Sequence, residues 1–173
     1  MQVPPESIRF DHYNGTIALF SPHLPKVYDA QSQFHSIPGH ITLITAEEYK
    51  LLKRPLLDAI TSALAVDHVY LVGEGASKDG SVRWDCVVWN EGNRWRVRMG
   101  LGKRDFHVTT SSRDDHYLDK SIGAVLNKRG IDGMMDRWRG LSVEGLYEVI
   151  MSCQNIEMVR HLAGSWLGSC TDM

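Results

Sequence analysis

Short apolar runs alternate with helix-like stretches over the first 110 residues, and the rest of the chain has an almost wholly helical pattern. β-Branched residues and alternating apolar positions predict strands at 15–20, 39–45, 68–72, 82–89, 94–99 and 106–110. The four residues 90–93 suit a hairpin loop between two of these strands. The pattern indicates an α/β or α+β domain.

A helix signal follows the second predicted strand. Thr45 and Glu48 have the spacing of a capping box, in which each side chain accepts a hydrogen bond from an early backbone donor. Apolar residues then recur at helical spacing over 49–64. Pro55 interrupts this stripe, so either the helix kinks there or a second helix begins at Pro55.

Helical patterns also dominate the last third of the chain. Asp114 or Asp115 is expected to cap a helix that runs to about residue 128, and further helices are expected at 142–152 and 155–167. We therefore expect one domain over residues 1–130 and a C-terminal helical extension over 131–173 that packs on it as a single structural unit.

Composition narrows the class of protein without assigning a function. The chain has 173 residues, of which 43% are hydrophobic and 23% charged, as in ordinary globular proteins. A net charge of −2 argues against binding nucleic acid through bulk positive charge, but leaves room for a local phosphate site. Three cysteines without regular spacing suggest neither a disulfide framework nor a zinc motif. With no apolar run of membrane-spanning length and no secretory signal, an intracellular protein, cytoplasmic or nuclear, is expected.

Two predicted strands carry the same polar pair. His40-Ile41-Thr42 and His107-Val108-Thr109 are both His-x-Thr segments, 67 residues apart. Because side chains alternate along a strand, the histidine and threonine of each segment share one face and the apolar residues share the other. Each strand therefore offers one face to a core and an imidazole-plus-hydroxyl face to something else.

These segments resemble the motifs of the two-histidine (2H) phosphoesterase superfamily, and in particular its ligT-like and RNA-repair cyclic phosphodiesterases. GHITLI looks like the first motif and DFHVTTS like the second, in which Thr110 replaces the usual apolar last residue. The likeness covers about residues 10 to 112. It implies an α+β fold of two pseudo-symmetric lobes, with antiparallel sheets lining a central cleft and helices outside.

The resemblance also implies a chemistry. Two facing imidazoles can act as a general acid and a general base, and the Thr42 and Thr109 hydroxyls can bind phosphate oxygens. We expect hydrolysis of a 2′,3′-cyclic phosphate, on an RNA end or a nucleotide, to a 2′-phosphate, without a metal or cofactor. By analogy with relatives, His107 is favoured as the base and His40 as the acid, but the sequence does not decide between this assignment and the reverse.

Two alternatives stay open. The same fold could bind RNA ends or nucleotides without catalysis. It could also cleave another phosphodiester, such as a 2′-5′ linkage, an ADP-ribose cyclic phosphate or a 3′ oligonucleotide tail.

Other residues are weaker candidates. Tyr13 is a candidate for stacking on a base, and Lys103 and Arg104 for contacting a substrate phosphate, although an ordinary exposed loop explains them equally well. The alternating arginines of the predicted strand 94–99 are expected on a solvated sheet face. The acidic segment 114–116 suits a helix start better than a metal site.

Overall fold

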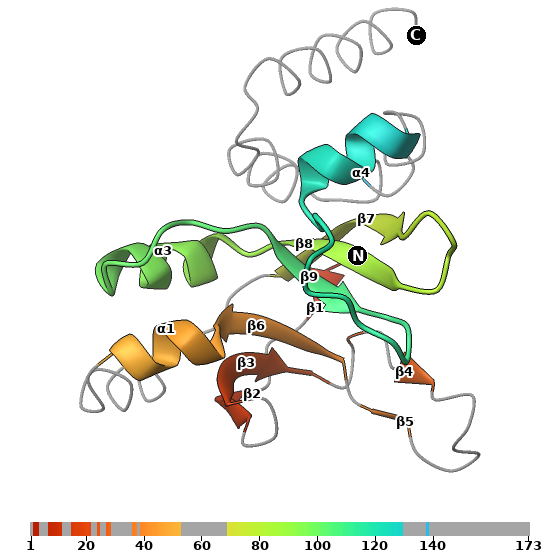
Figure 1. The fold of residues 1–173 in the computed structure, drawn as a ribbon. Coiled ribbons are helices and arrows are strands. Elements are labelled where there is room, and N and C mark those ends of the chain that lie inside the picture. The colour runs from red at the N-terminus through yellow and green to blue at the C-terminus, as the bar shows by residue number, and fades with distance from the viewer. Residues whose placement is uncertain are drawn as a thin grey trace, which may run out of the picture.

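The computed structural model describes residues 2–3, 7–11, 15–21, 24, 27–28, 36–37, 39–52, 69–129 and 138 (Figure 1). In these ranges the elements are β1 (Gln2–Val3), β2 (Ser7–Asp11), β3 (Thr16–Phe20), β4 (Val27–Tyr28), β5 (Ser36–Ile37), β6 (His40–Ile44), α1 (Ala46–Leu51), β7 (Val69–Ala76), β8 (Arg83–Val88), α3 (Asn90–Arg98), β9 (Phe106–Thr109) and α4 (Ile122–Arg129). None of the helices in these ranges has the length and apolar character needed to cross a membrane. Tyr13 and the predicted helices at 142–152 and 155–167 lie outside the described residues.

The strands form two main sheets. One has four strands in the order β1-β7-β8-β9 and the other has three in the order β2-β3-β6, while β4 and β5 form a separate pair. Every pairing is antiparallel. The expected α+β class with antiparallel sheets is therefore confirmed. The strands expected near residues 15–20, 39–45, 68–72, 82–89 and 106–110 are all present.

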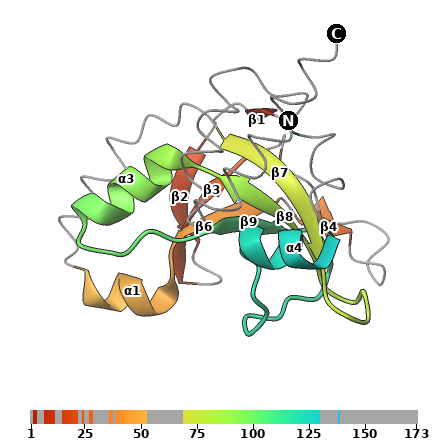
Figure 2. The same cartoon turned by 90° about the horizontal axis from the view of Figure 1, so that it is seen from above.

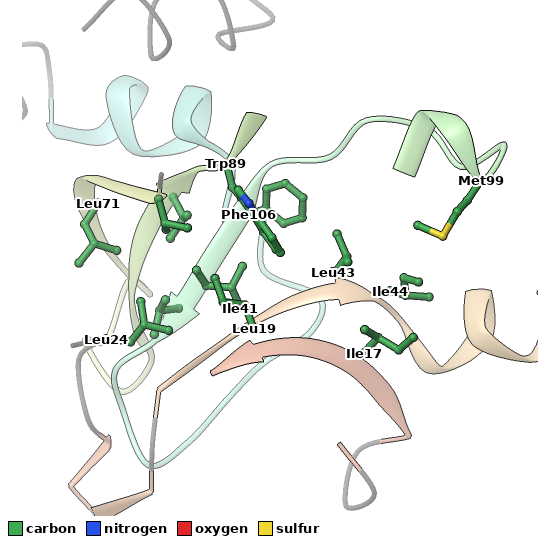
Figure 3. Close-up of a cluster of buried hydrophobic side chains, with 13 residues drawn as sticks. Ile17, Leu19, Leu24, Ile41, Leu43, Ile44, Leu71, Trp89, Met99 and Phe106 are labelled. Atoms are coloured by element: carbon green, nitrogen blue, oxygen red, sulfur yellow. The ribbon is translucent and has the colours of Figure 1, made fainter. Parts of the chain in front are cut away.

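Alternation along the strands creates two apolar clusters. The larger joins both sheets and includes residues from β3, β6, β7, β8 and β9 (Figure 3). The smaller lies on the other face of the four-stranded sheet, where α4 and Trp138 cover it. Val82, Trp84, Cys86 and Val88 share this second face, in keeping with the alternation of the strand predicted at 82–89. Thr109 and His107 on β9 pair with Trp84 and Cys86, respectively, and therefore lie beside the second cluster.

The predicted capping box at the start of α1 is confirmed. Thr45 accepts a hydrogen bond from the backbone N–H of Glu48, and the Glu48 carboxylate accepts one from the backbone N–H of Thr45. The helix ends at Leu51, and Leu52 after it has an extended backbone. The remainder of the predicted stripe, residues 53–64, lies outside the described ranges.

The strand predicted at 94–99 is wrong, and so is the hairpin loop before it. Residues 90–98 form helix α3, whose inward positions are Gly92, Trp95, Arg96 and Met99, at helical spacing. Glycine is needed at 92, since a Cβ there would lie 2.6 Å from the Trp89 ring. The prediction failed because Arg96 was assigned to solvent. In the structure Arg96 is buried and paired with Glu48, and counting it among the inward positions reveals the helical period.

The helix expected from Asp114 or Asp115 begins later than predicted. α4 starts at Ile122, where the Ser121 hydroxyl accepts a hydrogen bond from the backbone N–H of Ala124. Asp114 and Asp115 lie in the preceding loop instead. The Asp115 carboxylate accepts a hydrogen bond from the backbone N–H of Tyr117, which stabilises a turn rather than a helix start.

Replacing Gly75 by alanine is expected to destabilise the protein. Gly75 on β7 pairs with Trp84 on β8, and a Cβ at 75 would lie 2.1 Å from the indole. Either the ring or the strand would have to move, at a cost of about 1–3 kcal/mol. Chemical denaturation measures the loss. Gly102→Ala is the matched control, because a Cβ there meets nothing within 4 Å. Equal stability of both variants would contradict this account of the packing.

Candidate active site

The two His-x-Thr segments lie on neighbouring edge strands. β6 is the edge of the three-stranded sheet and β9 the edge of the four-stranded sheet. The two strands lie alongside one another (Figure 2). They belong to different hydrogen-bond ladders, since β6 pairs with β3 and β9 pairs with β8. Segments 67 residues apart in sequence are thus brought together by packing of the two sheets.

The predicted alternation holds on both strands. The apolar residues of β6 and β9 are buried in the cluster between the sheets, where they are Ile41, Leu43, Ile44, Phe106 and Val108. Ile44, the last residue of β6, departs from the alternation because it is buried next to the buried Leu43. The polar residues, His40, Thr42, His107 and Thr109, are half-buried on the other face of each strand. One face of each strand therefore holds the sheets together, and the opposite face carries the imidazole and hydroxyl groups.

His107 is held in its neutral form. Burial lowers its pKa to about 4, and the positive charges of Lys120 and Arg104 act in the same direction, while Asp114 opposes them. His40 also contributes to this lowering, so the two imidazoles are close enough for a charge on one to disfavour a charge on the other. At neutral pH His107 can therefore accept a proton.

His40 has a different setting. Its ring lies against Phe20, with ring centroids 5.6 Å apart and the ring planes tilted by 33°. Phe20 is also its register partner on β3. Contact with the Phe20 ring on one side helps to hold the His40 imidazole in position.

The two threonines are placed to assist the histidines. Thr42 and Thr109 are half-buried and, by strand alternation, lie on the same faces as His40 and His107. A hydroxyl can donate a hydrogen bond to an anionic oxygen. The two pairs together place two imidazoles and two hydroxyls on the polar faces of adjacent strands.

Of the two loop cations suggested by the sequence, only Arg104 acts on His107. Its backbone is fixed by Asn93, whose amide group donates to the Arg104 carbonyl at 3.1 Å and accepts from the Arg104 N–H at 3.0 Å. Burial lowers the pKa of the guanidinium, as does the charge of Arg96, while Glu48 opposes both. Lys103 is exposed. The structure therefore favours Arg104 over Lys103 as a cation near His107.

Two residues of the site were not anticipated from the sequence. Lys120 is buried and forms an ion pair with Asp114, both in the loop between β9 and α4. Asp114 also lies 3.4 Å from the exposed imidazole of His116. The local sequence holds no signal for this arrangement, because the loop acquires its position only when α4 packs on the sheet. In the described ranges no three His, Cys, Asp or Glu side chains cluster as metal ligands would.

The alternating arginines predicted on a solvated face are also placed differently. The Arg96 side chain is only 4% exposed, and its guanidinium donates to both oxygens of Glu48, at 2.6 and 2.9 Å. It also donates to the backbone carbonyls of Leu43 at 2.7 Å and Gly102 at 2.8 Å. Arg94 remains exposed and pairs with Glu91 on the same helix. Arg96 therefore fixes β6 and α1 to α3, and is a structural residue.

Comparison with known proteins agrees with this geometry. A family model described as "Swiss Army Knife, 2H phosphoesterase domain" matches residues 10–116, well over half of the chain, and spans both His-x-Thr segments. Searches of the curated proteins and of the solved structures found no match. The resemblance seen in the two motifs is confirmed at the level of the superfamily. The chain belongs to the Swiss Army Knife 2H phosphoesterase family, and its activity class is phosphoesterase hydrolysis.

Proposed function

We propose that the protein hydrolyses a 2′,3′-cyclic phosphate, on an RNA end or a nucleotide, to a 2′-phosphate. The observation that carries the proposal is the pairing of the two motifs on adjacent edge strands, with His107 in neutral form and close to His40. A neutral imidazole beside one that can carry a proton is the pair that acid–base cleavage of a phosphodiester requires.

In the proposed reaction His107 is the base and His40 the acid. Water attacks phosphorus and gives a proton to the His107 imidazole. The bond from phosphorus to O3′ breaks, and His40 gives its proton to O3′. The products are a 2′-phosphate and a 3′-hydroxyl group, and solvent exchange restores both imidazoles.

Charge on the phosphate is stabilised by the neighbouring donors. The Thr42 and Thr109 hydroxyls donate to the two non-bridging oxygens, which carry the increasing negative charge of the transition state. Arg104 adds a positive charge on the same side as His107. These groups supply binding and orientation, so the reaction needs no further cofactor.

The test is a substrate panel with product analysis. An RNA oligonucleotide ending in a 2′,3′-cyclic phosphate is incubated with the protein in EDTA, beside a 2′-5′-linked dinucleotide, an ADP-ribose cyclic phosphate and an oligonucleotide with a 3′ tail. We expect conversion of the cyclic end to a 2′-phosphate, and none with the His40→Ala/His107→Ala double variant. Release of a 3′-phosphate would overturn the proposed leaving group. Turnover of another panel member alone would transfer the mechanism to that bond.

The pH dependence of kcat/KM provides a second prediction. The base must be neutral, so activity should be lost as pH falls through the His107 pKa of about 4, rather than near the ordinary histidine value of 6.5. Initial rates measured from pH 3.5 to 9 in buffers of constant ionic strength check this. An acid limb near 6.5 would contradict the assignment of His107, with its lowered pKa, as the base.

A further inference from the structure

The loop between β9 and α4 brings one buried charged group to the side of His107. The Lys120 side chain is 4% exposed, and its ammonium group forms an ion pair with Asp114. A buried lysine normally needs such a partner, because an uncompensated charge in the interior is costly. The family match ends at residue 116, so it includes Asp114 but not Lys120. The ion pair is therefore not wholly contained in the matched region.

Strand register places Lys120 at the level of the catalytic histidine. Cys86 on β8 is the register partner of His107. The Cys86 thiol contacts the backbone carbonyls of Lys120 at 3.6 Å and Ser121 at 3.9 Å. The Lys120 backbone therefore lies over the sheet next to His107, and the buried side chain cannot move far from it.

Resting on the proposed function, we propose that Lys120 is a positioning residue of the site, a buried cation that Asp114 holds beside His107 and that keeps the imidazole unprotonated before the reaction. Lys120 acts through His107 and does not itself transfer a proton. Its role differs from that of the threonines, which bind the phosphate.

The charges around His107 make the expected direction definite. Lys120 and Arg104 disfavour a proton on the imidazole, as does His40 across the gap to β6, while Asp114 favours one. Asp105 directly precedes β9, and its carboxylate is hydrogen-bonded to the backbone N–H of Ile122 at the start of α4. Of these charged groups Lys120 has the largest effect, so its removal should make His107 easier to protonate.

The experiment follows the His107 ring proton by NMR as pH is varied, and needs no substrate. Lys120→Met keeps the aliphatic stem and removes the charge, and should shift the titration midpoint upward by roughly one pH unit. Lys120→Arg should keep the wild-type midpoint. Lys103→Met, which removes an exposed cation from the loop before β9, is the matched control and should leave it unchanged.

A second variant covers the case in which Lys120→Met fails to fold. Lys120→Met/Asp114→Asn leaves no buried charge unpaired, and should shift the midpoint in the same direction by less, because Asp114 acts in the opposite sense. An unchanged midpoint in either folded variant would overturn the proposal. Because the titration is read without turnover, a shifted midpoint in a protein that cleaves no cyclic phosphate would contradict the proposed function and leave the role of Lys120 intact.

Discussion

His107→Ala and His40→Ala should each lower kcat/KM for the cyclic phosphate by about 10²–10⁴-fold. Each variant removes one of the two proton-transfer groups, while the apolar faces of β6 and β9 that hold the sheets together are untouched. The double variant should be little worse than the poorer single variant, because groups that act in one step are not additive. Initial rates on the same oligonucleotide measure all three.

The fold must be shown to survive in these variants. Both histidines are half-buried and lie outside the apolar clusters, so the circular dichroism spectrum and thermal midpoint should stay near those of the wild type. His116→Ala is the matched control, because this imidazole lies in a loop and its side chain is 89% exposed. Activity within a few-fold of wild type in either single histidine variant would rule out the two-histidine mechanism.

The largest effect on stability is expected at Arg96. Arg96→Met removes a buried guanidinium that bonds Glu48 and two backbone carbonyls, and leaves the carboxylate without its partner. Breaking a buried pair in this way costs about 3–5 kcal/mol of unfolding free energy. For a chain of this size the thermal midpoint should fall by roughly 6–20 °C.

Two controls separate the buried pair from surface charge. Arg94→Met on the same helix breaks an exposed pair with Glu91 and should cost no more than about 1 kcal/mol. The double variant Arg96→Met/Glu48→Leu should recover part of the loss, since it leaves no buried charge unpaired. Denaturant unfolding monitored by tryptophan fluorescence checks both. If Arg96→Met were as stable as Arg94→Met, the Arg96–Glu48 pair would not contribute to the stability of the fold.

The same pair predicts how stability responds to acid. The hydrogen bond from Arg96 lowers the Glu48 pKa from 4.5 to about 2, against the opposing effect of burial. Because the folded-state pKa is below the unfolded one, this stabilisation is complete above pH 4.5 and is lost as pH falls toward 2. In the Glu48→Gln variant, this contribution to the fall in unfolding free energy between pH 4.5 and about 2 should disappear. Denaturant unfolding at several pH values measures it.

Strand positions were predictable where one face is apolar and the other polar. β6 and β9 show this alternation clearly, and their histidines and threonines lie on the face that alternation assigns. α3 was mistaken for a strand because Arg96 looks like a solvent-facing residue until Glu48 and the Leu43 carbonyl surround it. Lys120 was equally hidden, since its burial depends on where a loop crosses the sheet. A sequence pattern therefore indicates which face of a strand or helix is apolar. It does not indicate which charged residues far apart in the sequence become partners in the folded chain.

The separate ladders of β6 and β9 have a consequence for how such a site can diversify. No backbone hydrogen bonds between the two strands are found in the described residues, so the spacing of the imidazoles is set by the bulk of side chains such as Ile41 and Phe106 beneath them. A change of one methylene in that layer alters the gap without altering either motif. The spacing between His40 and His107 is thus an adjustable property of the core, and we expect substitutions in that layer to change which ligands fit without touching either motif.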